Sequence, residues 1–146
     1  MARKLSERQW AILLVGILVA AIAGLYATTL AIQPPEVPPA VVRSVHLVIE
    51  EPGWSIRYDP ASTTNNSAFS LLIEASSRLD FPVRYLTFQI PQGVFVTEIN
   101  GSANGEGDRY WQYWVNGVYA DLAADRTGLH NDDVVLWRFA IPQEGG

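Results

Sequence analysis

Residues able to do acid–base or nucleophilic chemistry are few in this 146-residue sequence, and they do not converge. The two histidines, His46 and His130, lie far apart, and neither belongs to a metal-binding spacing such as His-x-x-x-His. The serines gather over 60–77 without the Gly-x-Ser-x-Gly elbow of a nucleophilic serine. Cysteine is absent, which excludes disulfides, thiolate metal ligands and a cysteine nucleophile. The sequence therefore predicts a protein that is not an enzyme.

Two groups of carboxylates could do acid–base work, but their neighbours favour a simpler interpretation. Asp121 with Asp125, and Asp132 with Asp133, would each need a buried carboxyl group of shifted pKa. The Asn, Gly and Arg residues beside them are typical of solvated turns. The loop "NGSANGEGD" at 100–108 carries alternate oxygens that calcium could use, but it lacks the helix–loop–helix frame. We therefore expect turns and a polar hairpin loop, with no metal and no cofactor.

The strongest signal for a binding site is the aromatic stretch "YWQYWVNG" at 110–117. Successive side chains of a strand point to opposite faces, so Tyr110 and Trp114 share one face and Trp111 and Tyr113 the other. One aromatic face can form core, and a second must meet a loop, a partner or a flat ligand. We expect a partly exposed aromatic platform rather than core alone. Its candidate residues are Tyr110, Trp111, Tyr113, Trp114, Asn116 and Gly117.

The elements that must position these residues are mostly strands, predicted within a domain over 42–142. A helix is expected over 67–80, capped by Asn66 or Ser67, between two N-terminal strands and several later ones. The pair Asn116-Gly117 favours a tight hairpin turn. The predicted fold class is α+β, a β-grasp-like mixed sheet with one helix packed on it, and a short tail follows at 143–146.

The first part of the chain is predicted to be a membrane anchor. From Trp10 to Ile32 there are 23 residues without a charge, and such a helix would be roughly 34 Å long, enough to cross a hydrocarbon core. A cleaved signal peptide is the alternative, because 21–23 and 29–31 fit small-x-small cleavage patterns, although its apolar region is usually shorter. The basic tail over 1–9 is expected in the cytoplasm, which makes the anchor single-pass and the C-terminal domain extracytoplasmic.

Small residues within the predicted transmembrane helix recur every four positions. These residues are Gly16, Ala20, Gly24 and Thr28. They lie along one stripe of a helix, and such stripes allow two membrane helices to approach closely. Gly and Ala are also common in membrane helices in general. We expect this helix to pack against another transmembrane helix or membrane protein.

The segment that follows separates the anchor from the domain. Its proline-rich sequence, "QPPEVPPA" in a linker over 33–41, favours a semi-rigid extended stalk. From residue 33 onward the chain has seven arginines, no lysine and 14 acidic residues, a formal charge of −7. An acidic domain repels phosphate backbones, so nucleic acid is excluded as a partner.

The second half of the domain resembles a known family. Ile99, Asn100 and Gly101 form an "IN-G" segment, and a glycine-rich loop, the aromatic strand ending in Asn116-Gly117 and a turn into "VVLWRF" follow. This pattern resembles the transcobalamin-like C-terminal domain, a β-grasp-type module found also as domain of unknown function 4430. The resemblance covers about 42–140. It departs from the family where 131–133, "NDD", replaces the usual Gly-Asp turn.

The resemblance implies a corrinoid as a candidate ligand. Tyr110, Trp111, Tyr113, Asn116 and Gly117 match the motif that lies near the ligand in the vitamin carriers. In those carriers the module covers a helical domain that has no counterpart in this sequence, so these residues would offer one wall. Two functions follow: a membrane-anchored, non-catalytic binding module for a partner protein or flat ligand, or a single-span accessory subunit of a larger membrane complex.

Overall fold

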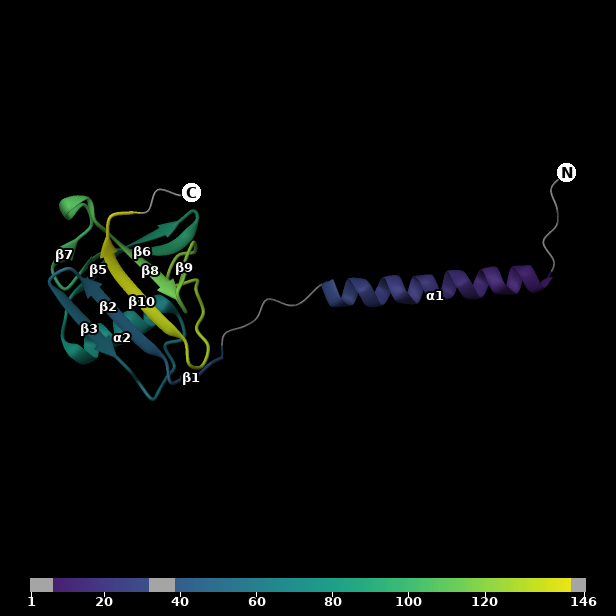
Figure 1. Ribbon diagram of the computed structural model, residues 1–146, viewed down its shortest axis with the longest axis horizontal. Helices are drawn as coiled ribbons and strands as arrows, with labels where there is room; N and C mark the ends of the chain where they lie inside the picture. The colour runs from purple at the N-terminus through teal and green to yellow at the C-terminus, as the bar shows by residue number, and fades with distance from the viewer. Residues whose placement is uncertain (1–6, 32–38, 143–146) are drawn as a thin grey trace. The chain divides into compact units, whose positions relative to one another are not determined.

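The computed structural model describes residues 7–31 and 39–142, and the chain divides into two compact units, Met1–Glu36 and Val37–Gly146. The first unit contains one helix, α1 (Glu7–Ala31), drawn in purple in Figure 1. Within the residues that the structure describes, no helix combines the length and the apolar character needed to cross a bilayer. The transmembrane helix expected over 10–32, together with its stripe at Gly16, Ala20, Gly24 and Thr28, therefore stays a prediction.

The second unit is a mixed α+β domain in which strands predominate, as predicted, and its largest element is a five-stranded sheet. In spatial order the strands are β3 (Trp54–Tyr58), β2 (His46–Glu51), β10 (Val134–Ala140), β8 (Tyr110–Val115) and β9 (Val118–Tyr119). The two central strands, β2 and β10, run parallel, and all other neighbours are antiparallel. The first and last long strands therefore meet at the centre of the sheet.

One face of this sheet is covered by helix α2 (Ala68–Leu79). The helix begins at Ser67, one of the two predicted caps, whose hydroxyl accepts a hydrogen bond from the backbone N–H of Ser70. Ala75 lies three and four positions after Leu72 and Leu71, so all three residues lie on the helix face that is buried in the core. They join alternate residues of the sheet, among them Ile49, Val135 and Trp137.

A single carboxylate ties α2 to the segments before it. Glu74 accepts hydrogen bonds from the Tyr58 hydroxyl at 2.6 Å and from Nδ2 of Asn65 at 2.6 Å, and it also accepts one from the Thr63 hydroxyl. These donors come from β3, from the short strand β4 (Ser62–Thr63) and from the loop after it. Strand β4 in turn pairs with β1 (Val42–Arg43).

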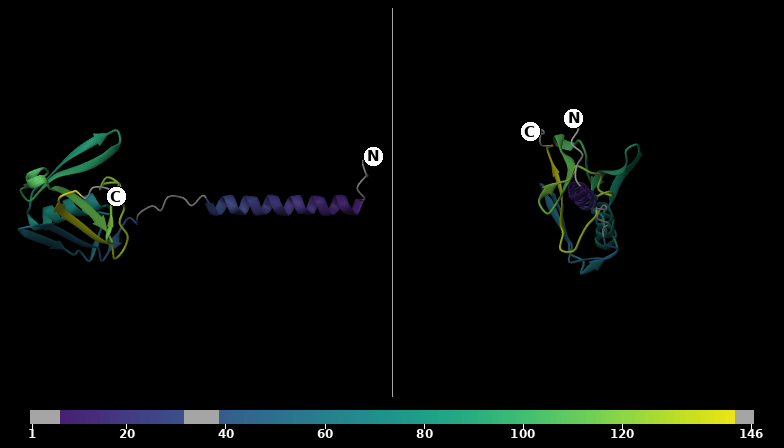
Figure 2. Two further views of the ribbon diagram at one scale, coloured as in Figure 1. Left: turned by 45° about the horizontal axis from the view of Figure 1, so that its top comes forward. Right: turned by 90° about the vertical axis from the view of Figure 1, so that its right-hand side faces the viewer.

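A second, three-stranded sheet is the main departure from the predicted single sheet. It consists of β5 (Val83–Gln89), β6 (Gln92–Ile99) and β7 (Ser102–Ala103), with β5 at one edge. A short 3₁₀ turn, Glu106–Asp108, leads from it back to β8. Strands β5 and β6 form a long hairpin over 83–99, called here the β5–β6 hairpin, which stands away from the five-stranded sheet (Figure 2). The Ile90–Pro91 peptide at its tip is cis.

Candidate binding site: an aromatic cleft beside the β5–β6 hairpin

Strand β8 sends its aromatic side chains to opposite faces of the five-stranded sheet, as the alternation predicts. Trp111 and Tyr113 are 4% and 7% exposed and belong to the core on the α2 side. Tyr110 is 41% exposed, and Trp114 is half-buried on the opposite face. The six predicted residues therefore do not form one surface.

The inward-facing aromatics of β8 are fixed by ring contacts and hydrogen bonds. Trp111 lies 5.1 Å from Phe139 between ring centroids, and its Nε1 donates to the carbonyl of Ser102 at 2.8 Å. Tyr113 stacks on Trp137 at 4.9 Å. These positions set two large aromatic rings side by side beneath the β5–β6 hairpin.

The hydroxyl of Tyr113 holds the segment after β9 in place. It bonds to the carbonyl of Leu122 at 2.7 Å and to Oγ1 of Thr127 at 2.6 Å. Burial raises the pKa of Tyr113, and the negative charges of Asp121 and Asp125 add to this rise, while the hydrogen bond with Thr127 opposes it. The tyrosine is therefore neutral at physiological pH and available as a donor.

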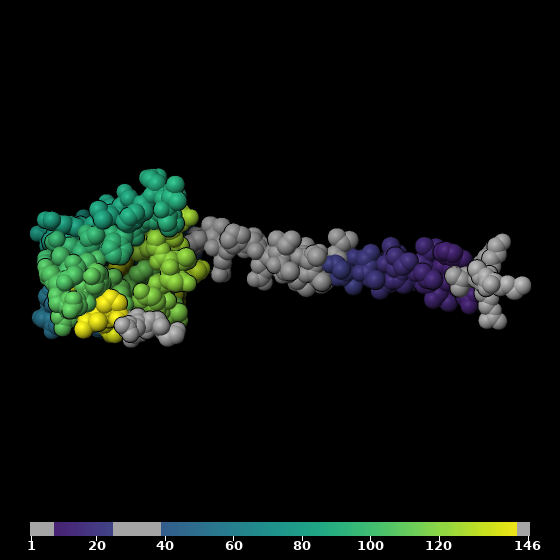
Figure 3. All heavy atoms as spheres, turned by 90° about the horizontal axis from the view of Figure 1, so that it is seen from above, coloured from purple at the N-terminus to yellow at the C-terminus, as the bar shows by residue number. Residues whose placement is uncertain are grey.

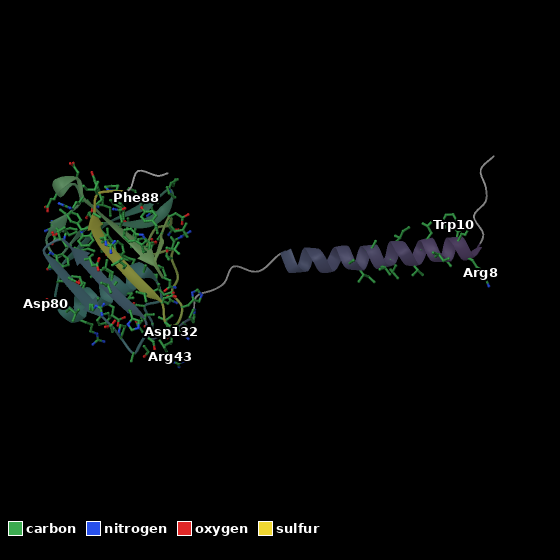
Figure 4. The ribbon with its side chains drawn as sticks, viewed as in Figure 1. Arg8, Trp10, Arg43, Asp80, Phe88 and Asp132 are labelled. Atoms are coloured by element: carbon green, nitrogen blue, oxygen red, sulfur yellow. The ribbon has the colours of Figure 1, made fainter. Side chains whose placement is uncertain are left out.

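Between the β5–β6 hairpin and the segment 119–126 lies a cavity of about 920 Å³, called here the aromatic cleft. Figure 3 shows the hollow between the teal hairpin and the yellow-green segment. The hairpin contributes Phe88 and Phe95, the segment contributes Ala120 and Leu122, and Trp111 and Tyr113 also line it. Figure 4 places Phe88 at the opposite end of the domain from Arg43 and Asp132.

Three polar residues of the hairpin and the segment also line the aromatic cleft: Gln92, Asp121 and Arg126. Nη1 of Arg126 lies 3.4 Å from Oε1 of Gln92, a long hydrogen bond that joins the segment to the hairpin. Asp121 brings a negative charge to the lining. The cleft thus combines apolar walls with a few polar groups, the usual make-up of a small-molecule site.

The hairpin is also fastened to the segment beside the cleft. The backbone N–H of Val94 donates to Oδ1 of Asp125 at 2.8 Å. A Cβ placed on Gly93 would lie 2.6 Å from Cβ of Ala123, so only glycine permits this approach. These contacts set the width of the aromatic cleft.

The outward face of β8 is built differently. Trp114 meets Tyr119 edge-on at 5.5 Å, and the Arg138 guanidinium lies over the Trp114 ring at 5.7 Å from its centroid. Arg138 also pairs with Glu50 at 2.8 Å. One side of Trp114 is therefore occupied by a cation from the same sheet.

The last two predicted site residues, Asn116 and Gly117, form the turn between β8 and β9. Both have positive φ, 51° and 79°, as the Asn-Gly pair predicts. The Asn116 amide donates to Oδ1 of Asp133 at 2.7 Å and accepts from the N–H of Val134 at 2.9 Å. Asn116 thus positions the start of β10.

The carboxylates and histidines considered for catalysis lie apart from the aromatic cleft, except for Asp121, which lines it, and Asp125, which fastens the hairpin beside it. His46 pairs with Asp59 at 2.7 Å, and Asp133 accepts from the backbone N–H of His130 at 2.8 Å. Across residues 7–31 and 39–142, no group of three or more His, Cys, Asp or Glu side chains could hold a metal ion. In the loop considered for calcium, the Asn104 side chain bonds instead to the backbone of Val96 and Trp111.

Phe88, Phe95 and the 119–124 segment were missed by the sequence reasoning. The signal for the hairpin was present, since "YLTFQIPQGVF" is apolar and nearly free of charge. This pattern predicts strands, but it does not show that the side chains of β5 are mostly exposed.

Comparisons with known proteins place this domain among related folds. The model of a family described as Domain of unknown function (DUF4430) matches residues 80–140. No curated protein matches the chain.

Solved structures also resemble the chain. One is a protein from Ruminococcus gnavus ATCC 29149 described as a "putative metal binding protein", with a TM-score of 0.54 and 15% identity, covering 71% of this chain and 99% of that one. Another is haptocorrin in complex with Cbi, with a TM-score of 0.56 and 16% identity, covering 75% of this chain and 27% of haptocorrin. At these identities the likeness shows a shared fold, and the resemblance to a transcobalamin-like domain predicted from the sequence is supported at that level.

Proposed function

We propose that the domain over 42–142 is a non-catalytic binding module that takes a flat, largely apolar ligand in the aromatic cleft. The observation that carries the proposal is the cavity of about 920 Å³ between the β5–β6 hairpin and the segment 119–126. Ligand sites of proteins usually measure about 300–1,000 Å³ and are mostly apolar, with a few polar groups that orient the ligand. The cleft meets both conditions.

The charges around the cleft favour a neutral or cationic ligand. Asp121 lines the cleft and Asp125 lies beside it, so two carboxylates give this place a negative potential. The opposing charge, Arg126, is directed to Gln92. An anionic ligand would meet this potential without a dedicated partner.

The fold likeness suggests the first ligand to test. Haptocorrin was solved in complex with Cbi, and the chain shares the fold of 27% of that protein. A corrinoid is large and flat, so it would use the cleft as one wall and extend beyond it. Such a ligand remains a proposal for this chain.

Equilibrium dialysis of the full chain in mild detergent would test the proposal, using cyanocobalamin and riboflavin as two uncharged flat probes. The variant Ala120→Phe keeps the tryptophan content and fills the cleft, because Ala120 lines it. Ala140→Phe is the matched control, since Ala140 is also half-buried but lies at the end of β10, outside the cleft lining. We expect at least a tenfold loss of affinity for Ala120→Phe and none for Ala140→Phe. Equal binding by both variants, or no binding of either probe by the wild type, would contradict the proposal.

We also propose that residues 10–32 hold this module at a membrane, with the domain on the extracytoplasmic side. The support comes from the sequence: the stretch has no charge, basic residues precede it, and the backbone over Glu7–Ala31 is one helix. Alkaline carbonate extraction of membranes tests this, because a retained helix stays in the pellet. Release of the chain into the supernatant, or a mature N-terminus beyond Ala23, would argue against it.

The stripe of Gly16, Ala20, Gly24 and Thr28 would dock this helix against another membrane protein, as an accessory subunit requires. Purification in mild detergent should then recover the chain in fixed ratio with that protein. Gly24→Leu should abolish the association, because a bulky side chain separates the two helices. Recovery of the wild-type chain alone would leave the free module as the better description.

A further inference from the structure

The β5–β6 hairpin carries an open strand edge. Among residues 39–142, strand β5 is outermost in its sheet and β6 is the one strand that pairs with it. Its residues from Arg84 to Gln89 are all exposed, with Leu86 at 54% and Phe88 at 48%. The strand thus presents unpaired backbone groups together with apolar side chains.

This edge lacks the devices by which monomeric proteins protect such strands. Those devices are charged side chains, proline within the strand, bulges and very short edges. Over 83–97 the only charged residue is Arg84, which lies at the base of β5 and pairs with Glu98 at 3.5 Å. The register shift between β5 and β6 also falls at the base, between Arg84 and Tyr85. The two edge strands of the five-stranded sheet differ from β5 in this respect. Strand β9 has two residues, and β3 carries the exposed Arg57.

We propose that β5 pairs antiparallel with β5 of a second copy of this chain, which joins two three-stranded sheets into one. In an antiparallel pair, residues directly opposite each other point to the same face of the sheet. A two-fold axis perpendicular to the sheet therefore places odd-numbered residues of β5 opposite odd-numbered residues of the other copy, and even-numbered residues opposite even-numbered ones. With Thr87 on the axis, Thr87 meets its own copy and Leu86 meets Phe88 of the partner copy. Phe95, which is the β6 neighbour of Leu86, extends the same apolar stripe.

Charge favours a second copy over other occupants of this edge. The chain from residue 33 onward has a formal charge of −7, and the hairpin strands contain no acidic residue over 83–97. Two copies therefore approach with least repulsion along β5. A bilayer is a poor occupant, because the open backbone edge would lose its hydrogen bonds to water in hydrocarbon.

The pairing surface and the proposed ligand site share Phe88, and Leu86 distinguishes the two proposals. Leu86 lies on the edge strand but does not line the aromatic cleft, whereas Phe88 does. Leu86→Lys should disrupt pairing, because it places a charge opposite Phe88 of the other copy. Val118→Lys is the matched control: Val118 is also an exposed apolar residue of an edge strand, but that strand has only two residues.

Sedimentation of the full chain in density-matched detergent tests the proposal over a range of protein concentrations. We expect a dimer whose dissociation constant rises at least tenfold in Leu86→Lys and is unchanged in Val118→Lys. Gly24→Leu should leave the dimer intact, which distinguishes pairing through β5 from packing of α1. A monomeric wild type, or a dimer that resists Leu86→Lys, would overturn the proposal.

Covalent trapping checks the register, because the chain has no native cysteine. Thr87→Cys should be cross-linked to its own copy by a short bismaleimide, and combining it with Leu86→Lys should abolish the product. Val118→Cys should give no dimer under the same conditions. Equal cross-linking of both cysteine variants would contradict the register. Unchanged circular dichroism of Leu86→Lys would show that the variant is folded.

Discussion

At the scale of single residues, Glu74 carries more of the fold than its half-buried position on α2 indicates. Burial alone would raise the pKa of its carboxyl group, but hydrogen bonds from Thr63, Tyr58 and Asn65, with the charge of Arg78, lower it overall. The pKa of Tyr58 is raised, first by burial and then by its bond to Glu74. The lowered pKa of Glu74 and the raised pKa of Tyr58 are both those of a neutral tyrosine that donates a hydrogen bond to a charged carboxylate.

Glu74→Gln should destabilise the domain by about 1–2 kcal/mol at pH 7, because the amide cannot accept all three hydrogen bonds. A carboxyl group whose pKa is lowered on folding stabilises the native state above its unfolded pKa, and this contribution is lost as the pH falls. The difference between wild type and variant should therefore shrink below about pH 4.5. Urea unfolding of both proteins at pH 7 and below pH 4 would show it. A difference that is constant with pH would refute this role.

Tyr113 should make the free energy of unfolding depend on pH in the opposite direction from Glu74, and at high pH. Because its pKa is raised in the folded state, its protonated form is stabilised by folding, and the unfolding free energy should fall as the pH rises past 10.0. Tyr113→Phe should remove this component and lose about 1 kcal/mol at pH 7, since the bonds to Leu122 and Thr127 disappear. Thermal unfolding of both proteins between pH 8 and pH 11 is the measurement. If the stability of wild type and Tyr113→Phe changed with pH in the same way, Tyr113 would not be the group responsible.

At the scale of elements, the turn between β8 and β9 holds the start of the central strand β10 through the side chain of Asn116. Asn116→Ala should cost about 2–3 kcal/mol, because it removes two side-chain hydrogen bonds to Asp133 and Val134 and places alanine at positive φ. Chemical denaturation measures this cost. An effect below about 0.5 kcal/mol would mean that the turn is held by other contacts.

Adding one methyl group at Gly93 should change the position of the β5–β6 hairpin. Gly93→Ala forces a Cβ to within 2.6 Å of Ala123, so the hairpin should move away from the segment 119–126 and weaken ligand binding in the cleft. Gly53→Ala is the control, because its Cβ would meet only the flexible carboxylate of Glu51 at 3.1 Å. Hydrogen exchange should quicken at Val94 in Gly93→Ala alone. Unchanged exchange at Val94 would contradict this view of the hairpin.

Local patterns in the sequence were enough to predict several elements. The alternation of β8, the cap at Ser67 and the Asn116-Gly117 turn each depend on residues within a few positions of one another. The aromatic cleft could not be predicted in this way. Its walls, Phe88 to Phe95 and Tyr119 to Arg126, are distant in the sequence, and only tertiary packing brings them together.

The aromatic residues of β8 were expected on two faces, with a partly exposed platform on one of them, and the structure shows what covers each face. Alternation shows that Tyr110 and Trp114 oppose Trp111 and Tyr113, but it does not show what covers each face. Arg138 and Tyr119 take up part of the outer face, while the inner face opens into the cleft. The candidate residues therefore divide between a surface and a cavity.

At the scale of the whole molecule, a predicted membrane segment precedes a domain for which we propose ligand binding and pairing with a second copy. The anchor rests on 10–32, the ligand site on the aromatic cleft and the pairing on β5, and Phe88 belongs to both the cleft and β5. Gly24→Leu, Ala120→Phe and Leu86→Lys should act independently, because each substituted residue belongs to one of these sites alone. Measuring all three variants in the association and dialysis assays would show whether the functions are separable.

The most direct test of the central claim is to follow the tryptophan indole N–H signals by NMR while cyanocobalamin or riboflavin is added. Trp111 and Trp137 line the aromatic cleft, whereas Trp114 lies on the other face of the same sheet. The account predicts that the signals of Trp111 and Trp137 shift and that the signal of Trp114 does not. A shift of Trp114 with Trp111 and Trp137 unchanged would place the ligand on the open face and contradict the cleft.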